Sequence, residues 1–254
     1  MKITILGSGA AGGVPMISAG WGRCDPSQPR NRRRRPSILV EAGGQAVLVD
    51  TSPDLREQLL DADVRRLDAV LFTHAHADHL HGIDDLREVN RAMGGPIDAY
   101  ASAVTLDEIR ARFGYVLEPL PKNSPIYKPW LIPHELTGPF QLGSMEIVPF
   151  DQDHGYCRTT GFRFGPMAYS TDVVNLPDAS MALLGGLDLW IVGCLTDTPH
   201  ATHAHLEKVL AWVEQLQPKR TLITHMMPKL DYDVLCATLP PGVAPAYDGL
   251  TIDL

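Results

Sequence analysis

The chain of 254 residues is predicted to have an α/β fold, because short apolar strands and amphipathic helices alternate along it. Apolar runs typical of buried strands recur between glycines and prolines. Helical spacing of leucine and valine stands out in residues 205–216. With 44% hydrophobic residues the chain can bury a large core, and we expect one domain over residues 1–254.

The first half predicts strands, a hairpin and two helices before a segment of irregular structure. Residues 3–6 form a strand, 37–50 a hairpin that turns at Gly43 and Gly44, and 69–72 a second buried strand. Helices are expected from Pro53 onward and over 83–93. Residues 114–142 carry six prolines and little periodicity, so we expect an inserted loop that walls a pocket.

The second half continues the alternation, and several of its strands end in a histidine or aspartate. The predicted elements are strand 145–154, hairpin 159–172, strand 187–193, helix 205–216 and strand 220–225. His154, Asp172 and His225 stand at three of these ends. Ligands at strand ends, gathered along one edge of a sheet core, are an economical way to build a metal site.

Residues 71–82, LFTHAHADHLHG, indicate metal binding most directly. His74, His76, Asp78 and His79 directly follow the apolar strand, and His81 is expected either to support the ligands from outside or to face solvent. A pattern H-x-H-x-D-H arises by chance in roughly one chain of this composition in a thousand. Imidazole and carboxylate are the ligands of hydrolytic metal sites, so the loop is predicted to hold metal.

The net charge of −8 argues against a general nucleic-acid binder. The one basic exception is 30–35, with five arginines in six residues, which is either a solvated loop or a patch that attracts phosphate. The four cysteines form no C-x-x-C pair, no apolar run is long enough to span a membrane, and no signal segment precedes the first strand. We therefore expect a cytoplasmic protein without a membrane partner.

The sequence resembles the metallo-β-lactamase superfamily through H74-A-H76-A-D78-H79, DTSPD, the histidine of DQDHG, the aspartate of YSTD and the histidine of LITH. Within it the chain is most similar to the phosphodiesterase branch, near the phosphoribosyl cyclic phosphate phosphodiesterase of phosphonate breakdown. The stretches RRRRPS, STD, THAHLEKVL and AYDGLTI carry that likeness. The resemblance implies an αββα sandwich, two mixed sheets with outer helices.

The resemblance also implies two divalent metal ions, zinc or manganese, with iron as a further option. Asp50 would orient the metal loop from behind. A cysteine-rich segment for a third zinc is missing, since only Cys24 lies in the corresponding stretch. The implied ligands are His74, His76 and His154 for one ion, Asp78, His79 and His225 for the other, and Asp172 bridging both.

The predicted activity is hydrolysis of a small cyclic phosphate or nucleotide-like phosphodiester by a hydroxide held between two metals. Asp78 and His203 are the predicted catalytic residues, with His203 as general acid or phosphate holder at the start of a helix. His205 is the alternative acid, and His205 and Arg35 are further candidates for substrate binding. A nuclease of RNA or DNA ends, a thioesterase or lactamase, a di-iron redox protein and a binding protein are the competing classes; a homodimer remains open.

Overall fold

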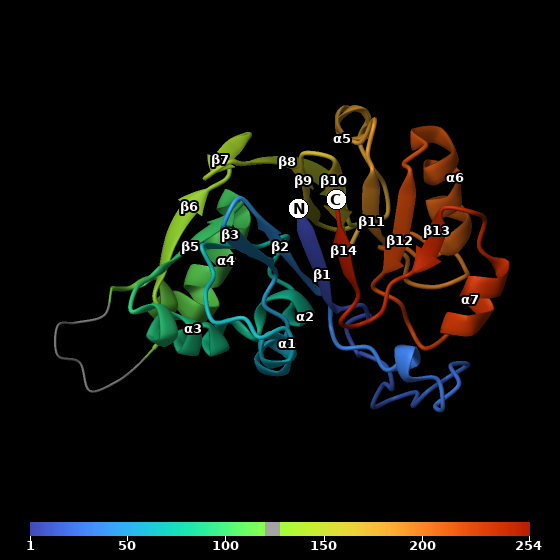
Figure 1. Ribbon diagram of the computed structural model, residues 1–254, viewed down its shortest axis with the longest axis horizontal. Coiled ribbons are helices and arrows are strands. Elements are labelled where there is room, and N and C mark those ends of the chain that lie inside the picture. Colours follow the sequence, from blue (N-terminus) through green and yellow to red (C-terminus); the bar gives the residue numbers. More distant parts are fainter. Residues whose placement is uncertain (120–127) are drawn as a thin grey trace.

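The computed structural model describes residues 1–119 and 128–254, and in this part of the chain two mixed β-sheets pack face to face (Figure 1). In the first sheet the pairings from β14 through β1 and β2 to β3 are antiparallel, and those from β3 through β4 and β5 to β6 are parallel. Its order is β14 (Thr251–Asp253), β1 (Lys2–Gly7), β2 (Ser37–Ala42), β3 (Gln45–Val49), β4 (Ala69–Leu71), β5 (Ile97–Ala101) and β6 (Leu131–Glu135).

The second sheet repeats this plan, with antiparallel strands from β7 to β10 and parallel strands from β10 to β13. Its order is β13 (Val243–Pro245), β12 (Arg220–Thr224), β11 (Leu189–Gly193), β10 (Met167–Ser170), β9 (Arg158–Phe164), β8 (Met145–Asp153) and β7 (Phe140–Leu142). The chain ends meet at the edge of the first sheet, where β14 pairs with β1.

Helices cover the outer face of each sheet, so the predicted α/β sandwich is confirmed (Figure 1). The first sheet carries α1 (Leu55–Asp61), α2 (Ala77–Leu80), α3 (Leu86–Met93) and α4 (Ala103–Phe113), and the second carries α5 (Asp178–Leu183), α6 (Leu206–Leu216) and α7 (Tyr232–Thr238). Short 3₁₀ turns are η1 (Pro29–Asn31), η2 (Ile83–Asp85) and η3 (Gly114–Leu117). No helix in the described ranges is long and apolar enough to cross a membrane.

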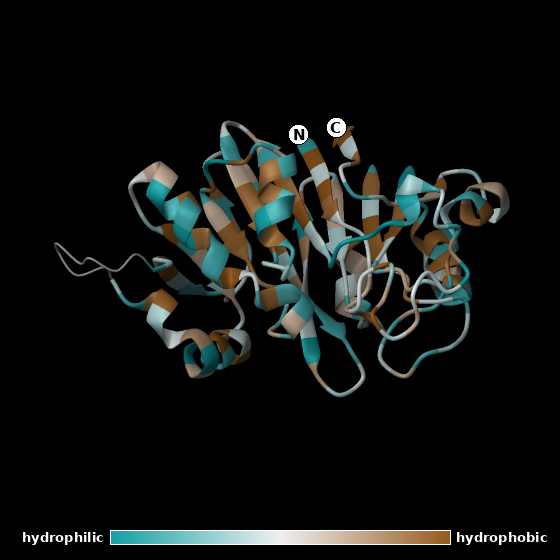
Figure 2. Ribbon diagram, turned by 90° about the horizontal axis from the view of Figure 1, so that it is seen from below, coloured by the Kyte–Doolittle hydropathy of each residue, from teal (hydrophilic) through white to brown (hydrophobic). Residues whose placement is uncertain are grey.

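The core has three layers, and the alternation of strand side chains assigns each residue to one of them. Ile3 and Ile5 of β1 point between the sheets, where they join Ile191 and Leu222 of the second sheet. Leu6 points the other way, into the layer under α1, α3 and α4. Figure 2 shows hydrophobic residues concentrated on the strands, whereas the helices carry both kinds.

The expectation of an irregular insertion over 114–142 was wrong for its second part. Strands β6 and β7 lie within it, and His134 of β6 stacks on Tyr100 of β5. Pro133 is tolerated within β6 because that strand lies at the sheet edge, where a missing N–H breaks no ladder, and Pro139 directly precedes β7. Residues 120–127 of that prediction lie outside the described part of the chain.

Helix α4 was not foreseen, although its start carries a signal. The Ser102 hydroxyl accepts a hydrogen bond from the Thr105 amide, at 3.3 Å, which caps the helix. Leu106 and Ile109 then bury one face of it. Helix α6 begins at Leu206, one residue after the predicted start at 205, so His203, which was expected at the start of the helix, lies in the preceding loop.

Parallel strands place the predicted ligands near one another. Asp50 and His74 follow the adjacent strands β3 and β4 at the same edge of the first sheet. Asp172 and His225 follow β10 and β12, which flank β11 in a parallel set. Because the carboxyl ends of parallel strands lie on the same side, these four residues meet where the two sheets face each other.

Candidate metal centre

Three residues of the site adopt a backbone conformation that ordinary side chains rarely take. Asp50, Asp172 and His225 have φ of 64°, 50° and 58°, in the left-handed region. Each directly follows or nearly follows a strand, so the turn redirects its side chain from the sheet into the site. Non-glycine residues in this region carry strain that a fold retains where function requires it.

The histidine loop is fixed from behind by a buried aspartate. Asp50 accepts hydrogen bonds from the Thr73 amide and hydroxyl, each at 2.8 Å, and its side chain is fully buried. The Arg112 guanidinium donates to the Ala75 carbonyl at 2.6 Å from helix α4. These bonds hold the loop between β4 and α2 in one conformation, so His74 and His76 project toward the opposite sheet.

The first cluster of ligand atoms comes from both sheets. His154 donates from Nδ1 to the Thr202 carbonyl at 2.7 Å, which leaves Nε2 facing the site. The Nε2 of His74 and the Nδ1 of His76 converge to 2.8 Å. One ligand atom from each member lies within 4.8 Å of the others, and the members are His74, His76, His154 and Asp172.

The second cluster is completely buried. His79 Nδ1 donates to the Asp50 carboxylate at 2.6 Å, so its Nε2 is directed into the site. A carboxylate behind a ligating imidazole fixes the ring tautomer and orientation, as predicted for Asp50. The ligand atoms again lie within 4.8 Å of one another, and the members are Asp78, His79, Asp172 and His225.

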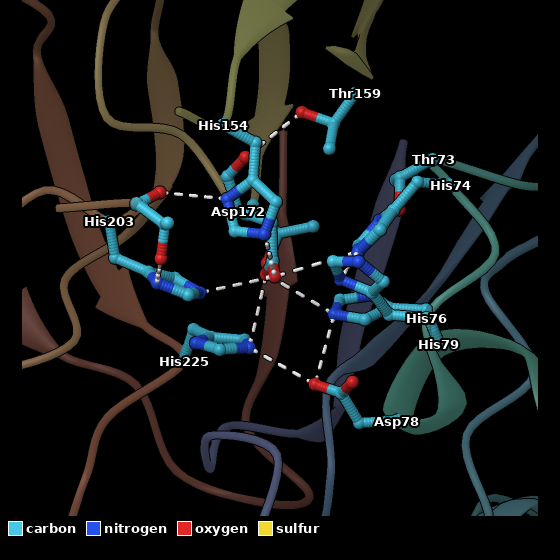
Figure 3. A network of polar contacts seen from close by, with 12 residues as sticks. Thr73, His74, His76, Asp78, His79, His154, Thr159, Asp172, His203 and His225 are labelled. Carbon is cyan, nitrogen blue, oxygen red and sulfur yellow. Dashed lines mark hydrogen bonds and ion pairs between the residues drawn. The ribbon is translucent and has the colours of Figure 1, made fainter. Parts of the chain in front are cut away.

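Asp172 belongs to both clusters and presents one oxygen to each (Figure 3). Its Oδ2 lies 3.6 Å from His74 Nε2 and 3.5 Å from His154 Nε2. Its Oδ1 lies 3.2 Å from His79 Nε2 and 3.0 Å from His225 Nε2. The carboxylate thus stands between the two ligand sets, where the sequence predicted a bridging residue.

In the first cluster the protein environment favours neutral imidazoles beside an ionised carboxylate. Burial lowers the pKa of His74 well below its usual value and that of His154 to about 4. Burial opposes ionisation of Asp172, but neighbouring imidazoles, His225 first, hold its pKa well below the usual range. Neutral imidazole and carboxylate are the forms that bind metal.

The residues fit divalent metal ions. Burial disfavours a charged His79, yet Asp78 and Asp172 raise its pKa well above the ordinary value, so the cluster favours a cation. The Nε2 of His79 is buried and has no hydrogen-bond partner among the described residues. A bound metal ion would supply the positive charge that these carboxylates favour and a partner for His79 Nε2. A mixed nitrogen and oxygen ligand set suits zinc, manganese or iron.

His203 lies at this centre and His205 does not contact it. His203 Nε2 is 3.2 Å from Asp172 Oδ2, and its Nδ1 is 2.8 Å from the Thr202 hydroxyl. The His203 ring packs against His154 and His225, with centroids 4.6 and 5.1 Å away. His205 is the N-cap of α6, and no side-chain contact in the described structure joins it to either cluster.

Tyr156 is a neighbour of the site that the sequence did not single out. Its hydroxyl lies 2.8 Å from His76 Nε2, and its ring stacks on the His76 ring at 5.8 Å. The side chain is 71% exposed, so it stands at the mouth of the centre. An aromatic residue two positions after His154 was the available signal.

The other two candidates lie elsewhere. His81 is exposed and contacts the edge of Phe113, as expected for a solvent-facing residue. Arg35 pairs with Asp54 at 3.0 Å and lines a cavity to which neither ligand cluster contributes. Its predicted part in substrate binding stays a prediction.

Comparisons with known proteins agree with this geometry. The model of the β-lactamase superfamily domain matches residues 45–226, which span the histidine loop and continue past His225. A crystal structure described as a new diphosphatase from the PhnP family is 35% identical, covers 100% of this chain and 97% of its own, and superposes with a TM-score of 0.91. These matches confirm the resemblance predicted from the sequence.

Two further relatives set the limits of the comparison. A Porphyromonas gingivalis protein named octanoyltransferase is 31% identical over 98% of this chain, which covers 51% of that protein. The chain spans about half the length, or less, of the curated relatives it matches. Zinc-bound PqqB from Methylobacterium extorquens is 21% identical, covers 100% of both chains with a TM-score of 0.77, and shares the fold.

Proposed function

Since the chain belongs to the β-lactamase superfamily, we propose that it is a dinuclear, metal-dependent phosphodiesterase for small phosphate diesters. The observation that carries this proposal is the placement of Asp172, with one oxygen toward each of two complete ligand sets. A single carboxylate shared in this way suits two metal ions held close together. The substrate would be a cyclic phosphate or a nucleotide-like diester.

Each protein group has a role that follows from its position. His74, His76 and His154 would hold one ion, and Asp78, His79 and His225 the other. When bound, two such ions activate water and neutralise charge on the phosphoryl oxygens. Burial favours the neutral imidazoles of His74 and His154, and hydrogen bonds fix the direction of two ligand rings, His79 through Asp50 and His154 through the Thr202 carbonyl.

His203 is the group placed to donate a proton to the leaving oxygen. Its Nε2 faces the space beside Asp172, while the Thr202 hydroxyl holds Nδ1. The side chain is 17% exposed, so it lies at the boundary between the buried centre and solvent. A donor there can reach the leaving group of a bound diester without competing for a place among the metal ligands.

A diphosphate is a second candidate substrate, favoured by the 35% identical PhnP-family structure described as a diphosphatase. Cleavage of a P–O–P bond needs the same neutralisation of phosphoryl charge as cleavage of a diester. The relative named octanoyltransferase instead directs attention to acyl chemistry, the thioesterase alternative, although this chain matches only half of that protein.

The test compares initial rates with bis(p-nitrophenyl) phosphate, a dinucleoside diphosphate and a glutathione thioester, using protein loaded with zinc or manganese. Metal content is measured in parallel, and about two ions per chain are expected. His203→Ala is the variant, and His205→Ala is its matched control because it removes a histidine from the same loop. Phosphate-ester cleavage that collapses only in His203→Ala supports the proposal. Thioester cleavage with inert phosphate substrates would sink it.

A further inference from the structure

A cavity of about 820 Å³ lies over the outer face of the first sheet, beside the edge where β14 pairs with β1. Thr4 and Leu6 of β1 contribute to its wall, on the side away from the intersheet core. Residues 29–35 enclose it together with α1 and the turn at 247–249, in the region below β1 and β14 in Figure 1. We call it the basic pocket, after the lining cations Lys2, Arg30, Arg32, Arg33, Arg34 and Arg35.

The basic pocket is separate from the metal centre. None of its lining residues belongs to either ligand cluster. It contains the arginine run that the sequence left as either a solvated loop or a phosphate patch, and that the proposed hydrolysis does not use. Any ligand of these arginines would therefore bind in the basic pocket and not at the metal centre.

The pocket carries an excess of positive charge within an acidic protein. Six cationic side chains line it, and three carboxylates do so as well, namely Asp54, Asp61 and Asp248, which leaves an excess of three cations. The whole chain has a net charge of −8. Such a concentration of one sign, in a concave wall, attracts anions.

Three of the arginines lack a carboxylate partner within the described residues. Arg30 lies over the rings of Tyr232 and Tyr247, at 5.0 and 4.4 Å, and Arg32 lies over Trp21 at 5.3 Å. Arg33 is 2% exposed, and its guanidinium donates to the Leu230 carbonyl at 2.7 Å, the Asn31 side-chain oxygen at 3.3 Å and the Met227 carbonyl at 3.5 Å, so it is held within the wall of the pocket. Arg30 and Arg32 are therefore the charges that remain for an anion.

The other pair of arginines is only partly neutralised by its neighbours. Arg34 contacts Asp61 at 2.7 Å, and the Asp61 side chain is 64% exposed. Arg35 contacts Asp54 at 3.0 Å with both side chains partly exposed. Exposed pairs of this kind contribute little stability, so the guanidinium groups can exchange a carboxylate for a more highly charged anion.

We propose that the basic pocket binds a nucleotide-sized phosphate ester at a site separate from the metal centre. Guanidinium forks match the oxygens of a phosphate group, and several of them surround one space here. Tyr247, Val14 and Pro15 in the wall offer contact surface for the organic part of the ligand. The volume falls within the range of sites for small organic molecules.

Isothermal titration of the metal-loaded protein with adenosine monophosphate tests the proposal, with adenosine and inorganic phosphate as comparison ligands. Arg30→Gln and Arg32→Gln each remove one unpaired charge, and we expect about tenfold weaker binding from each. Arg65→Gln is the matched control, because Arg65 is an exposed arginine that pairs with Asp63 outside the pocket. It should leave the affinity unchanged.

A further variant should strengthen the binding of adenosine monophosphate instead of weakening it. Asp61→Asn removes the carboxylate partner of Arg34 and with it one negative charge of the pocket, so we expect about threefold tighter binding. A loss of folding could not produce that gain. Hydrolysis of bis(p-nitrophenyl) phosphate is measured in the same variants and should stay at the wild-type rate, which separates this site from the catalytic one.

Each outcome decides the proposal. Weaker binding in both arginine variants and tighter binding in Asp61→Asn support it. Affinity that is unchanged in all three variants overturns it, and equal binding of adenosine overturns phosphate recognition. Equal affinity for inorganic phosphate overturns the organic ligand. Absence of hydrolysis with an intact isotherm would count against the proposed function and leave the basic pocket supported.

Discussion

Replacing Asp50 by asparagine changes one buried atom and should weaken metal binding at the second cluster. The Asp50 carboxylate accepts from His79 Nδ1 at 2.6 Å, from the Thr73 hydroxyl at 2.8 Å and from the Thr73 amide at 2.8 Å. Asparagine has the same shape and tolerates the φ of 64° at this position. The backbone turn is therefore preserved, and only the acceptor count changes.

The size of the effect follows from these contacts. Asparagine has one acceptor oxygen, so in either orientation its amide N–H group meets a donor, at Thr73 or at His79. If it meets His79, the ring must move its proton to Nε2, the atom that would ligate the metal. Loss of such a supporting carboxylate typically costs about 10- to 100-fold in metal affinity, or about 1.4–2.7 kcal/mol.

The assay is competition for zinc against a chromophoric chelator, with metal content measured after dialysis. Asp50→Asn should keep an ion at the cluster of His74, His76 and His154 and lose most of the other. Asp63→Asn is the matched control, because Asp63 also has positive φ, at 48°, but its side chain is 84% exposed and belongs to neither ligand cluster. Wild-type affinity for two ions in Asp50→Asn would refute this account of Asp50.

Three further predictions concern the rest of the site. His203→Ala should lower kcat for the phosphodiester by about 10²- to 10⁴-fold while the metal content stays unchanged; equal loss of metal would instead indicate a ligand. Tyr156→Phe should raise KM, because it removes a hydroxyl 2.8 Å from His76 Nε2 at the mouth, and leave the melting temperature unchanged; a large fall in the melting temperature would show a packing role. In metal-free protein the contribution of His154 to stability should fall as pH falls from about 6.5 to about 4, because burial lowers its pKa to about 4 and the unfolded state binds the proton first. Asp248, whose pKa burial raises to about 6, contributes the opposite slope in this window, so thermal denaturation is compared between wild type and His154→Gln, and an equal pH dependence in both would contradict the assignment.

The sequence predicted the ligands because their chemistry is local. Four of the candidate ligand side chains lie in one short loop after an apolar strand, and the others lie at or just after the ends of strands of their own. Residues that follow parallel strands lie at the same edge of the sheet whatever the order of the strands. Their proximity can therefore be predicted before the tertiary arrangement is known. The sequence analysis missed β6 and β7 because prolines normally indicate a loop, whereas Pro133 lies inside the edge strand β6 and Pro139 directly precedes β7.

Contacts between segments far apart in the chain could not be predicted from the sequence. The hydrogen bond from Tyr156 to His76 joins residues 80 positions apart, and that from His203 to Asp172 joins residues 31 positions apart. No local pattern specifies which of His203 and His205 turns toward the centre, because the choice depends on where α6 begins. The structure places that start at Leu206, which leaves His203 in the preceding loop beside Asp172.

The sequence by itself determined the α/β class, the family and the identity of the residues that can bind metal, because strand periodicity, ligand type and spacing are properties of short segments. The tertiary structure decided how the two oxygens of Asp172 divide between two ligand sets and how the arginines at 30–35 close a cavity with α1 and the C-terminal turn. Those arrangements depend on how the two sheets pack and on contacts between segments far apart in the chain. No short segment of the sequence specifies such contacts.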